Sequence, residues 1–273
     1  MVYLRSISKL PGFESSGYPL STPVMQNLER LPLNQPVTLI TGDNGSGKTT
    51  LMETLSRKLN AVRIDGEEAV SLPKITSFAS VDKALRVEMA RHPGRCFYFH
   101  AEGFVRYVDG VHHMRQSAHE ALNEIDEAYN GRSAYARNLA AMPHRRTLGE
   151  MQQLYDHDIT RRSHGEGHLD FYGARFKKGG LFLLDEPEGA LSFFNQYVLL
   201  TMILEASHNS QFIISTHSPV LLACPNAQIF SIQDGYIQES EYKNLESVQF
   251  LKDFLSQPGR YTAPLLANQE EDK

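Results

Sequence analysis

Short apolar runs recur along the chain and alternate with segments that have the length and composition of helices. Residues 37–40, 181–184 and 211–215 are the clearest of these runs. Runs of this kind are typical of strands buried on both faces of a sheet. Residues 50–55 and 191–206 each follow one of the runs and favour helices. The pattern therefore predicts an α/β fold built on a buried sheet.

Several other segments carry signals of their own. Residues 1–40 read as short strands and turns, because prolines and a Pro-Gly pair punctuate them. Residues 96–99 form an aromatic run that favours a strand, and the pattern near residues 81–90 favours a helix. Asp234-Gly235 between two apolar runs predicts a hairpin, and residues 244–256 are expected to form a closing helix.

A long middle segment differs in composition from the rest of the chain. In residues 113–160, Ala, Glu, Leu, Arg and Met dominate, and Leu122 and Ile125 recur at helical spacing. The segment predicts a helical lobe, which Gly131 and Pro143 are expected to divide into separate helices. The expected nucleotide-binding core comprises residues 1–102 and 178–273, and the inserted helical lobe comprises residues 103–177.

The segment Gly-Asp-Asn-Gly-Ser-Gly-Lys-Thr at residues 42–49 fits the phosphate-binding pattern G-x-x-x-x-G-K-[ST]. Its glycines let backbone N–H groups point inward at an anion, and the positive end of the following helix points at the same place. Lys48 can then reach the β- and γ-phosphates, and the Thr49 hydroxyl can coordinate Mg²⁺. The expected phosphate-binding residues are Asn44, Gly45, Ser46, Gly47, Lys48, Thr49 and Thr50.

Two carboxylates follow the apolar run at residues 181–184. Asp185 is placed to complete a Mg²⁺ site with Thr49, and Glu186 can polarise an attacking water as a general base. A buried strand that merely enters a loop can also end in acidic residues. The phosphate-binding loop upstream favours the functional interpretation.

Two further segments suggest contacts with phosphate. His217 ends the apolar run at residues 211–215 and can donate to a γ-phosphate, although a histidine at a strand end is often structural. Ser163 and Gly165 precede a helical segment, where a hydroxyl, an amide and a helix N-terminus could bind a second anion. A plain helix cap is the competing interpretation of Ser163.

Composition limits the classes of protein to consider. The chain has 273 residues, a net charge of −5 and two cysteines, Cys96 and Cys224. These values argue against a disulfide framework and against bulk attraction to nucleic acid, although pairs such as Arg145-Arg146 leave a local basic surface open. We find no secretory signal and no run of about 18 apolar residues, so we expect a cytoplasmic protein without a transmembrane segment.

The order of these motifs resembles that of ABC-type ATPases. The similarity is greatest to the soluble, stand-alone branch on the RecF- and SMC-like side, with Ser-His-Gly-Glu at 163–166, Leu-Leu-Asp-Glu-Pro-Glu at 183–188 and Thr-His-Ser-Pro at 216–219. The family signature is Ser-Gly-Gly-Gln, so His164 and Glu166 are departures from it.

The resemblance implies a P-loop sheet core with N-terminal antiparallel strands, an inserted helical lobe, and an ATP-dependent head-to-tail homodimer. Two Mg²⁺-bound ATP molecules would lie between the subunits. Glu102 is the nearest candidate for the family's glutamine, and the aromatic residue that stacks on adenine could be Tyr3, Phe13 or Tyr18. Each site would combine catalytic Lys48, Glu186 and His217 and metal-binding Thr49 and Asp185 of one subunit with Ser163 and Gly165 of the other.

Three functions fit this set of motifs. The first is an ATP hydrolase whose dimer drives or times a partner process, such as DNA repair or phage defence. The second is the energy subunit of a membrane transporter, for which the complete Leu-Ser-Gly-Gly-Gln signature is missing. The third is a binding module that ATP switches without turnover, and Glu186 argues against it because a base is present. The effector or partner protein is not identified by the sequence.

Overall fold

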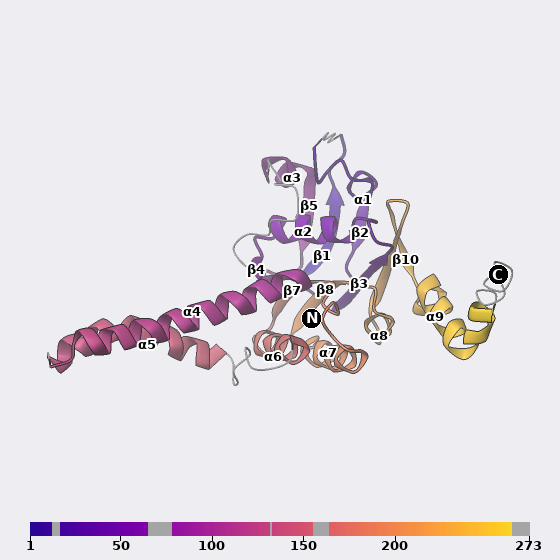
Figure 1. The fold of residues 1–273 in the computed structure, drawn as a ribbon. Coiled ribbons are helices and arrows are strands. Elements are labelled where there is room, and N and C mark those ends of the chain that lie inside the picture. The colour runs from indigo at the N-terminus through magenta and orange to yellow at the C-terminus, as the bar shows by residue number, and fades with distance from the viewer. Residues whose placement is uncertain (13–16, 65–77, 132, 155–163, 264–273) are drawn as a thin grey trace.

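The computed structural model describes residues 1–12, 17–64, 78–131, 133–154 and 164–263, and its elements alternate between strands and helices (Figure 1). The strands are β1 Leu4–Lys9, β2 Arg30–Pro32, β3 Val37–Gly42, β4 Val62–Ile64, β5 Leu85–Met89, β6 Cys96–His100, β7 Gly180–Asp185, β8 Ser210–Ser215, β9 Gln228–Gln233 and β10 Tyr236–Ser240. The helices are α1 Pro23–Gln26, α2 Lys48–Lys58, α3 Phe78–Ala84, α4 Ala101–Ala128, α5 Ala134–Leu154, α6 His164–Phe176, α7 Phe193–Ala206, α8 Pro219–Leu222 and α9 Glu246–Ser256, with a 3₁₀ turn at Tyr242–Asn244.

A seven-stranded sheet forms the centre of the fold, in the order β10-β9-β3-β8-β7-β6-β4. Every neighbouring pair from β9 to β4 is parallel, and β10 closes one edge as the second strand of a hairpin with β9. The pairing of Ile40, Ser215, Asp185 and His100 across β3, β8, β7 and β6 brings the carboxyl ends of these strands to one edge. Segments that follow the strands therefore converge there.

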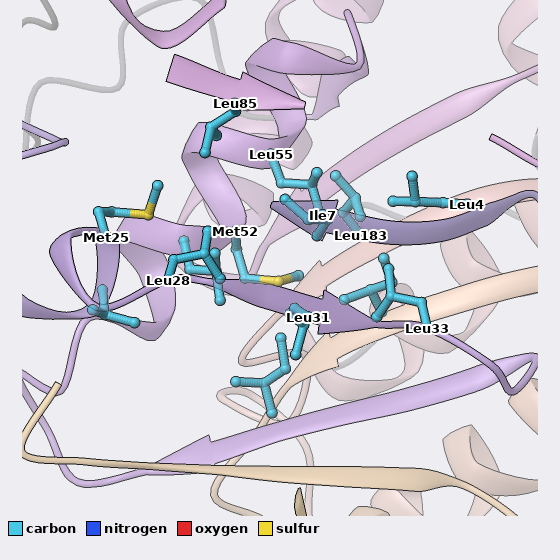
Figure 2. Close-up of a cluster of buried hydrophobic side chains, with 14 of the residues drawn as sticks. Leu4, Ile7, Met25, Leu28, Leu31, Leu33, Met52, Leu55, Leu85 and Leu183 are labelled. Carbon is cyan, nitrogen blue, oxygen red and sulfur yellow. The ribbon is translucent and has the colours of Figure 1, made fainter. Parts of the chain in front are cut away.

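A smaller antiparallel sheet, β2-β1-β5, covers one face of the structure and confirms the expected N-terminal antiparallel strands. Helix α2 lies between the two sheets, and its side chains join a buried cluster with Leu4 and Ile7 of β1 and Leu183 of β7. Figure 2 shows Met52 and Leu55 of α2 in this cluster. Because α2 begins directly after the phosphate-binding loop, this packing fixes the position of the loop.

Aromatic side chains fill the opposite face of the large sheet, beneath α6 and α7. The ring of Phe176 from α6 lies edge-on to both Phe182 of β7 and Phe212 of β8, with centroids 5.0 Å apart in each pair. Phe182 and Phe212 stack on each other at 5.1 Å. These contacts hold α6, the helix that begins beside the expected signature, against the sheet.

The helical pattern near residues 81–90 is only partly correct. Helix α3 ends at Ala84, and the chain then continues as β5, which pairs antiparallel with β1. The side chains of β5 alternate in exposure, from buried Leu85 to exposed Arg86 and half-buried Val87. This period of two fits a strand, and long-range pairing with β1 outweighs the local helical signal.

Helices α4 and α5 form a hairpin that projects from the core (Figure 1). The turn between them contains Gly131 at a φ of 75°, as expected for a break. Pro143, by contrast, lies inside α5 and does not end it, which corrects the sequence expectation. The proline leaves the carbonyl of Leu139 without its helical donor, but Leu139 is 54% exposed, so water can satisfy that group. Ala118 of α4 and Ala141 of α5 are both buried.

In the part of the chain that the structure describes, no helix is both long and apolar enough to cross a membrane.

We expect truncation of the central cluster to destabilise the fold. Leu183 is fully buried, so Leu183→Ala should lower the free energy of unfolding by about 2–5 kcal/mol. Leu139→Ala on the exposed side of α5 is the matched control and should change it by less than about 0.5 kcal/mol. Urea denaturation midpoints measure both, and equal losses in the two variants would contradict the assignment of the core.

Candidate functional site

The phosphate-binding loop is shaped by close packing against two other segments. A side chain at Gly42, whose φ is 152°, would come within 2.6 Å of the Ile232 carbonyl oxygen on β9. Gly47 has a φ of 99° and caps α2, and a side chain there would lie 2.5 Å from Val24 of α1. Both positions need glycine for conformation and for space. Glycines at both positions therefore let the loop, here called the phosphate cradle (residues 42–49), pack closely against β9 and α1.

Lys48 lies within this cradle. Its side chain is 4% exposed, and its Nζ donates to the carbonyl oxygens of Gly42 at 2.9 Å and Asp43 at 3.0 Å. Burial lowers the pKa of Lys48, and the nearby carboxylates of Glu186 and Asp185 oppose that shift. The hydroxyl of Ser46 is also buried and has no hydrogen-bond partner among the described residues. The Ser46 hydroxyl could thus donate to an anion in the loop directly, whereas Lys48 would first have to leave its two carbonyl acceptors.

Asp185 is fully buried at the end of β7. The Ser215 hydroxyl donates to its Oδ1, the Tyr98 hydroxyl donates to Oδ2 at 3.2 Å, and His100 Nε2 lies 3.7 Å from Oδ2. Burial raises the pKa of Asp185, while Ser215, His100 and Tyr98 favour its charged form. The carboxylate and the neighbouring hydroxyl oxygens are hard donors of the kind that fits Mg²⁺.

The structure brings Glu186 and His217 together. Glu186 Oε1 lies 3.4 Å from His217 Nε2, and both side chains are about two-fifths exposed, at 40% and 38%. Glu186 has a φ of 49°, a left-handed conformation that is uncommon for a residue with a side chain. Its N–H donates to the Ser215 carbonyl oxygen at 3.0 Å, which holds it there. Strained backbone of this kind is frequent at functional sites.

Two family models match the chain. The first, described as "AAA domain", covers residues 21–59, which include the phosphate-binding loop. The second, described as "AAA domain, putative AbiEii toxin, Type IV TA system", covers residues 127–223, which include Asp185, Glu186 and His217. Together with the parallel sheet and the phosphate-binding loop, these two matches give the chain a P-loop α/β fold.

Several solved structures resemble the chain at low identity. One is a nucleotide-free ATP-binding cassette from an ABC transporter, at 17% identity, with 94% of this chain and 96% of that chain covered and a TM-score of 0.44. Another is the Smc head domain of Pyrococcus furiosus with an extended coiled coil, bound to the C-terminal domain of ScpA. It is 13% identical, with 93% of this chain and 100% of that chain covered and a TM-score of 0.44. The SMC head domain of Thermotoga maritima is 15% identical, with 87% of this chain and 98% of that chain covered and a TM-score of 0.42. A comparison with curated proteins finds no match.

The remaining expected residues of the ATPase site fall in different places. Asn44 and Gly45 are exposed at the tip of the P-loop, and Thr49 and Thr50 are half-buried in the first turn of α2. Gly165 lies in the first turn of α6, whereas Ser163 lies outside the described residues.

The candidates for the glutamine and the adenine contact are only partly placed. Glu102 lies in the first turn of α4. Tyr3 donates to the carbonyl oxygen of Asn209, at the start of β8 and thus at the edge of the sheet opposite the P-loop. That position removes Tyr3 as an adenine contact. Tyr18 is half-buried, and Phe13 lies outside the described residues.

Sequence reasoning missed the side chains that hold the predicted ones. Tyr98, His100 and Ser215 surround Asp185, and Glu188 binds the loop that carries His217. Strand register was the signal for two of them, because His100 and Ser215 both pair with Asp185 across neighbouring parallel strands.

Burial of Asp185 predicts a dependence of stability on pH. Its raised pKa means that, above the usual value of ~3.9, the folded protein keeps a proton that the unfolded chain has lost. The free energy of unfolding from this group therefore falls as pH rises from that value through the raised pKa. Asp185→Asn should gain stability relative to the wild type over the same interval.

Urea midpoints without nucleotide or metal, at about pH 4 and about pH 7.5, measure the difference. Asp126→Asn on α4, whose side chain is 60% exposed, is the control and should show no such trend. A pH-independent difference between Asp185→Asn and the wild type would contradict the prediction.

Proposed function

We propose that the chain binds ATP with Mg²⁺ and hydrolyses it. The observation that carries this proposal is the contact between Glu186 and His217 at the sheet edge where the P-loop and Asp185 also lie. A base and a hydrogen-bond donor that lie together beside a phosphate cradle suit the attack of water on a γ-phosphate. A loop that only bound nucleotide would have no need of this pair.

Each side chain has a role in this chemistry. Lys48 would leave the carbonyl oxygens of Gly42 and Asp43 and donate to the β- and γ-phosphates. Thr49 and Asp185 would hold Mg²⁺, which supplies positive charge that stabilises the transferring phosphoryl group. Glu186 would accept the proton of the attacking water, and His217 would donate to a γ-phosphate oxygen.

The active form is proposed to be a head-to-tail dimer of this chain. The side chains of Glu186 and His217 are about two-fifths exposed, although His217 Nε2 is itself buried. This exposure supports the dimer, because a second surface would exclude water from the exposed part of the pair. Exposed aromatic side chains at the start of α7 also support it: Phe193 is 71% exposed and Phe194 is 73% exposed, just beyond the loop that carries Glu186. In such a dimer, Ser163 and Gly165 of the second copy would face the γ-phosphate.

The proposed partner is an effector protein, located with the ATPase in the cytoplasm. The second family model is named for a toxin of a toxin–antitoxin system, and its matched residues include α5 and the Glu186 region. ATP-dependent closure of the dimer would then change what the projecting α4–α5 hairpin presents to that effector. Phage defence is the process among those considered that agrees best with this description.

Nucleotide binding should depend on Lys48. Lys48→Ala removes the charged donor and is expected to weaken Mg-ATP binding by at least about 10–150-fold, the equivalent of one charge-assisted hydrogen bond. Lys58→Ala, at the far end of the same helix and paired with Asp82, is the control and should bind normally. Isothermal titration measures both variants, and retained affinity in Lys48→Ala would remove the P-loop assignment.

Dimerisation should follow ATP binding. Glu186→Gln is expected to bind ATP without cleaving it, and light scattering should show a shift from monomer to dimer mass only with Mg-ATP. Glu205→Gln, an exposed glutamate on α7, should turn ATP over and accumulate no dimer. Adding Ser163→Arg to Glu186→Gln should keep the protein monomeric, and an unaffected dimer would show that Ser163 is not at the interface.

A further inference from the structure

A third acidic side chain, Glu188, lies under the loop that carries His217. Its Oε1 accepts three hydrogen bonds: from the Thr216 hydroxyl at 2.6 Å, from the His217 N–H at 2.7 Å and from the Ser218 N–H at 3.1 Å. Two of these donors are main-chain groups. Glu188 therefore fixes the backbone of this loop, including the position of the His217 Cα, rather than one side chain.

Glu188 belongs to the same short loop as Glu186. The Gly189 N–H donates to the Glu186 carbonyl oxygen at 3.1 Å, and the Leu191 N–H donates to the Glu188 carbonyl oxygen at 2.8 Å, so this segment is a tight turn. One end of the turn carries Glu186, and the next part binds the His217 loop. The side chains of Glu186 and His217 are partly exposed, so the spacing of the two loops largely decides their 3.4 Å separation.

Gln196 of helix α7 also connects these two loops. The Ser218 hydroxyl donates to Gln196 Oε1 at 2.7 Å, and Gln196 Nε2 donates to the Leu191 carbonyl oxygen at 3.0 Å. Ser218 also accepts from the N–H groups of Val220 and Leu221 and caps α8. Glu188 is thus the charged member of a network that joins the loop after β7 to the loop after β8.

The charge of Glu188 is poorly explained by stability alone. Burial raises its pKa, and the three donors only oppose that shift. Its second oxygen, Oε2, is buried and has no hydrogen-bond partner within the described residues. A buried carboxylate with an unused oxygen costs free energy that an uncharged side chain of the same shape avoids.

We propose that Glu188 is a positioning residue that holds His217 against Glu186 for the attack on the γ-phosphate. This inference rests on the proposed ATP hydrolysis and assigns Glu188 no contact with nucleotide. Its charge strengthens the hydrogen bonds to the His217 and Ser218 amides, and that strength keeps the imidazole where Glu186 can use it.

The test is Glu188→Gln, which keeps the shape of the side chain and removes the charge. We expect kcat for ATP to fall by about 10–100-fold, as for a small misplacement of a reacting group, with KM changed by less than about threefold. The unfolding midpoint should not fall, because the variant mimics the protonated carboxyl that burial favours. Glu188→Gln combined with His217→Ala should be no slower than His217→Ala by more than about twofold, since both changes disable the same group.

Gln211→Leu is the matched control for a general loss of structure. Gln211 is a buried side chain that also binds main-chain groups, those of Tyr3 and Leu4, at the opposite edge of the sheet. This control should lower the unfolding midpoint and leave kcat unchanged. If Gln211→Leu and Glu188→Gln lost kcat alike, the role of Glu188 would be structural only.

A second measurement needs no turnover. In a histidine-labelled protein, the NMR signal of the His217 imidazole, assigned by its loss in His217→Ala, should shift in Glu188→Gln and stay in place in Gln211→Leu. An unmoved signal would overturn the proposal. So would a double variant whose loss of kcat is the product of the losses in Glu188→Gln and His217→Ala. Failure of the proposed function would instead appear as a wild type that releases no phosphate, and the NMR result would still decide the role of Glu188.

Discussion

Parallel pairing of β7 with β6 and β8 is the constraint on which the site depends. The register places His100, Asp185 and Ser215 side by side, and the same register continues through Ile40 of β3 to the start of the P-loop. A slip by one residue would turn the alternate side chains of β7 toward the other face of the sheet. The aromatic packing of Phe182 and Phe212 on one face and the cluster around Leu183 on the other oppose such a slip. Two apolar cores thus determine where the polar groups meet.

Three charged side chains at this edge are largely buried, and burial of charge costs free energy. Burial disfavours the charged forms of Lys48, Asp185 and Glu188, as the directions of their pKa shifts show. Opposite charges and short hydrogen bonds keep the groups in place, but they do not cancel the desolvation. A fold selected for stability alone would place uncharged side chains at these positions. The concentration of buried charge at one edge is therefore itself an argument that the edge carries a function.

The sequence was a good guide to elements and motifs that depend on local signals. The strands around residues 37–40, 181–184 and 211–215 were predicted, as was the hairpin at Asp234-Gly235, because buried runs and turn residues carry those signals in a few positions. β5 was missed because its strand character comes from pairing with β1, a partner far away in the sequence. Pro143 was misread because the pattern does not show that its helix is held by a neighbouring helix and open to water.

For the candidate site, too, local motifs carried the prediction, and the contacts between distant segments were missed. Motif spacing predicted roles for Lys48, Asp185, Glu186 and His217, because residue type and position in a motif indicate the chemistry. The groups that hold them are different in kind. Tyr98 reaches Asp185 from the middle of a neighbouring strand, and Glu188 binds backbone amides that belong to another loop. Contacts of that sort are set by three-dimensional packing, and a single sequence shows them only once the order of strands is known.

Burial divides the proposed site into two parts. Lys48 and Asp185 are buried, whereas the side chains of Glu186 and His217 are about two-fifths exposed, although His217 Nε2 is itself buried. In water, the field of a carboxylate or an imidazole is strongly screened, and the same groups act far more strongly once a surface covers them. In the proposed mechanism, nucleotide binding would be complete in one copy, while hydrolysis would need a second surface. That division would make hydrolysis report on assembly, and it gives a stand-alone ATPase a way to time a partner.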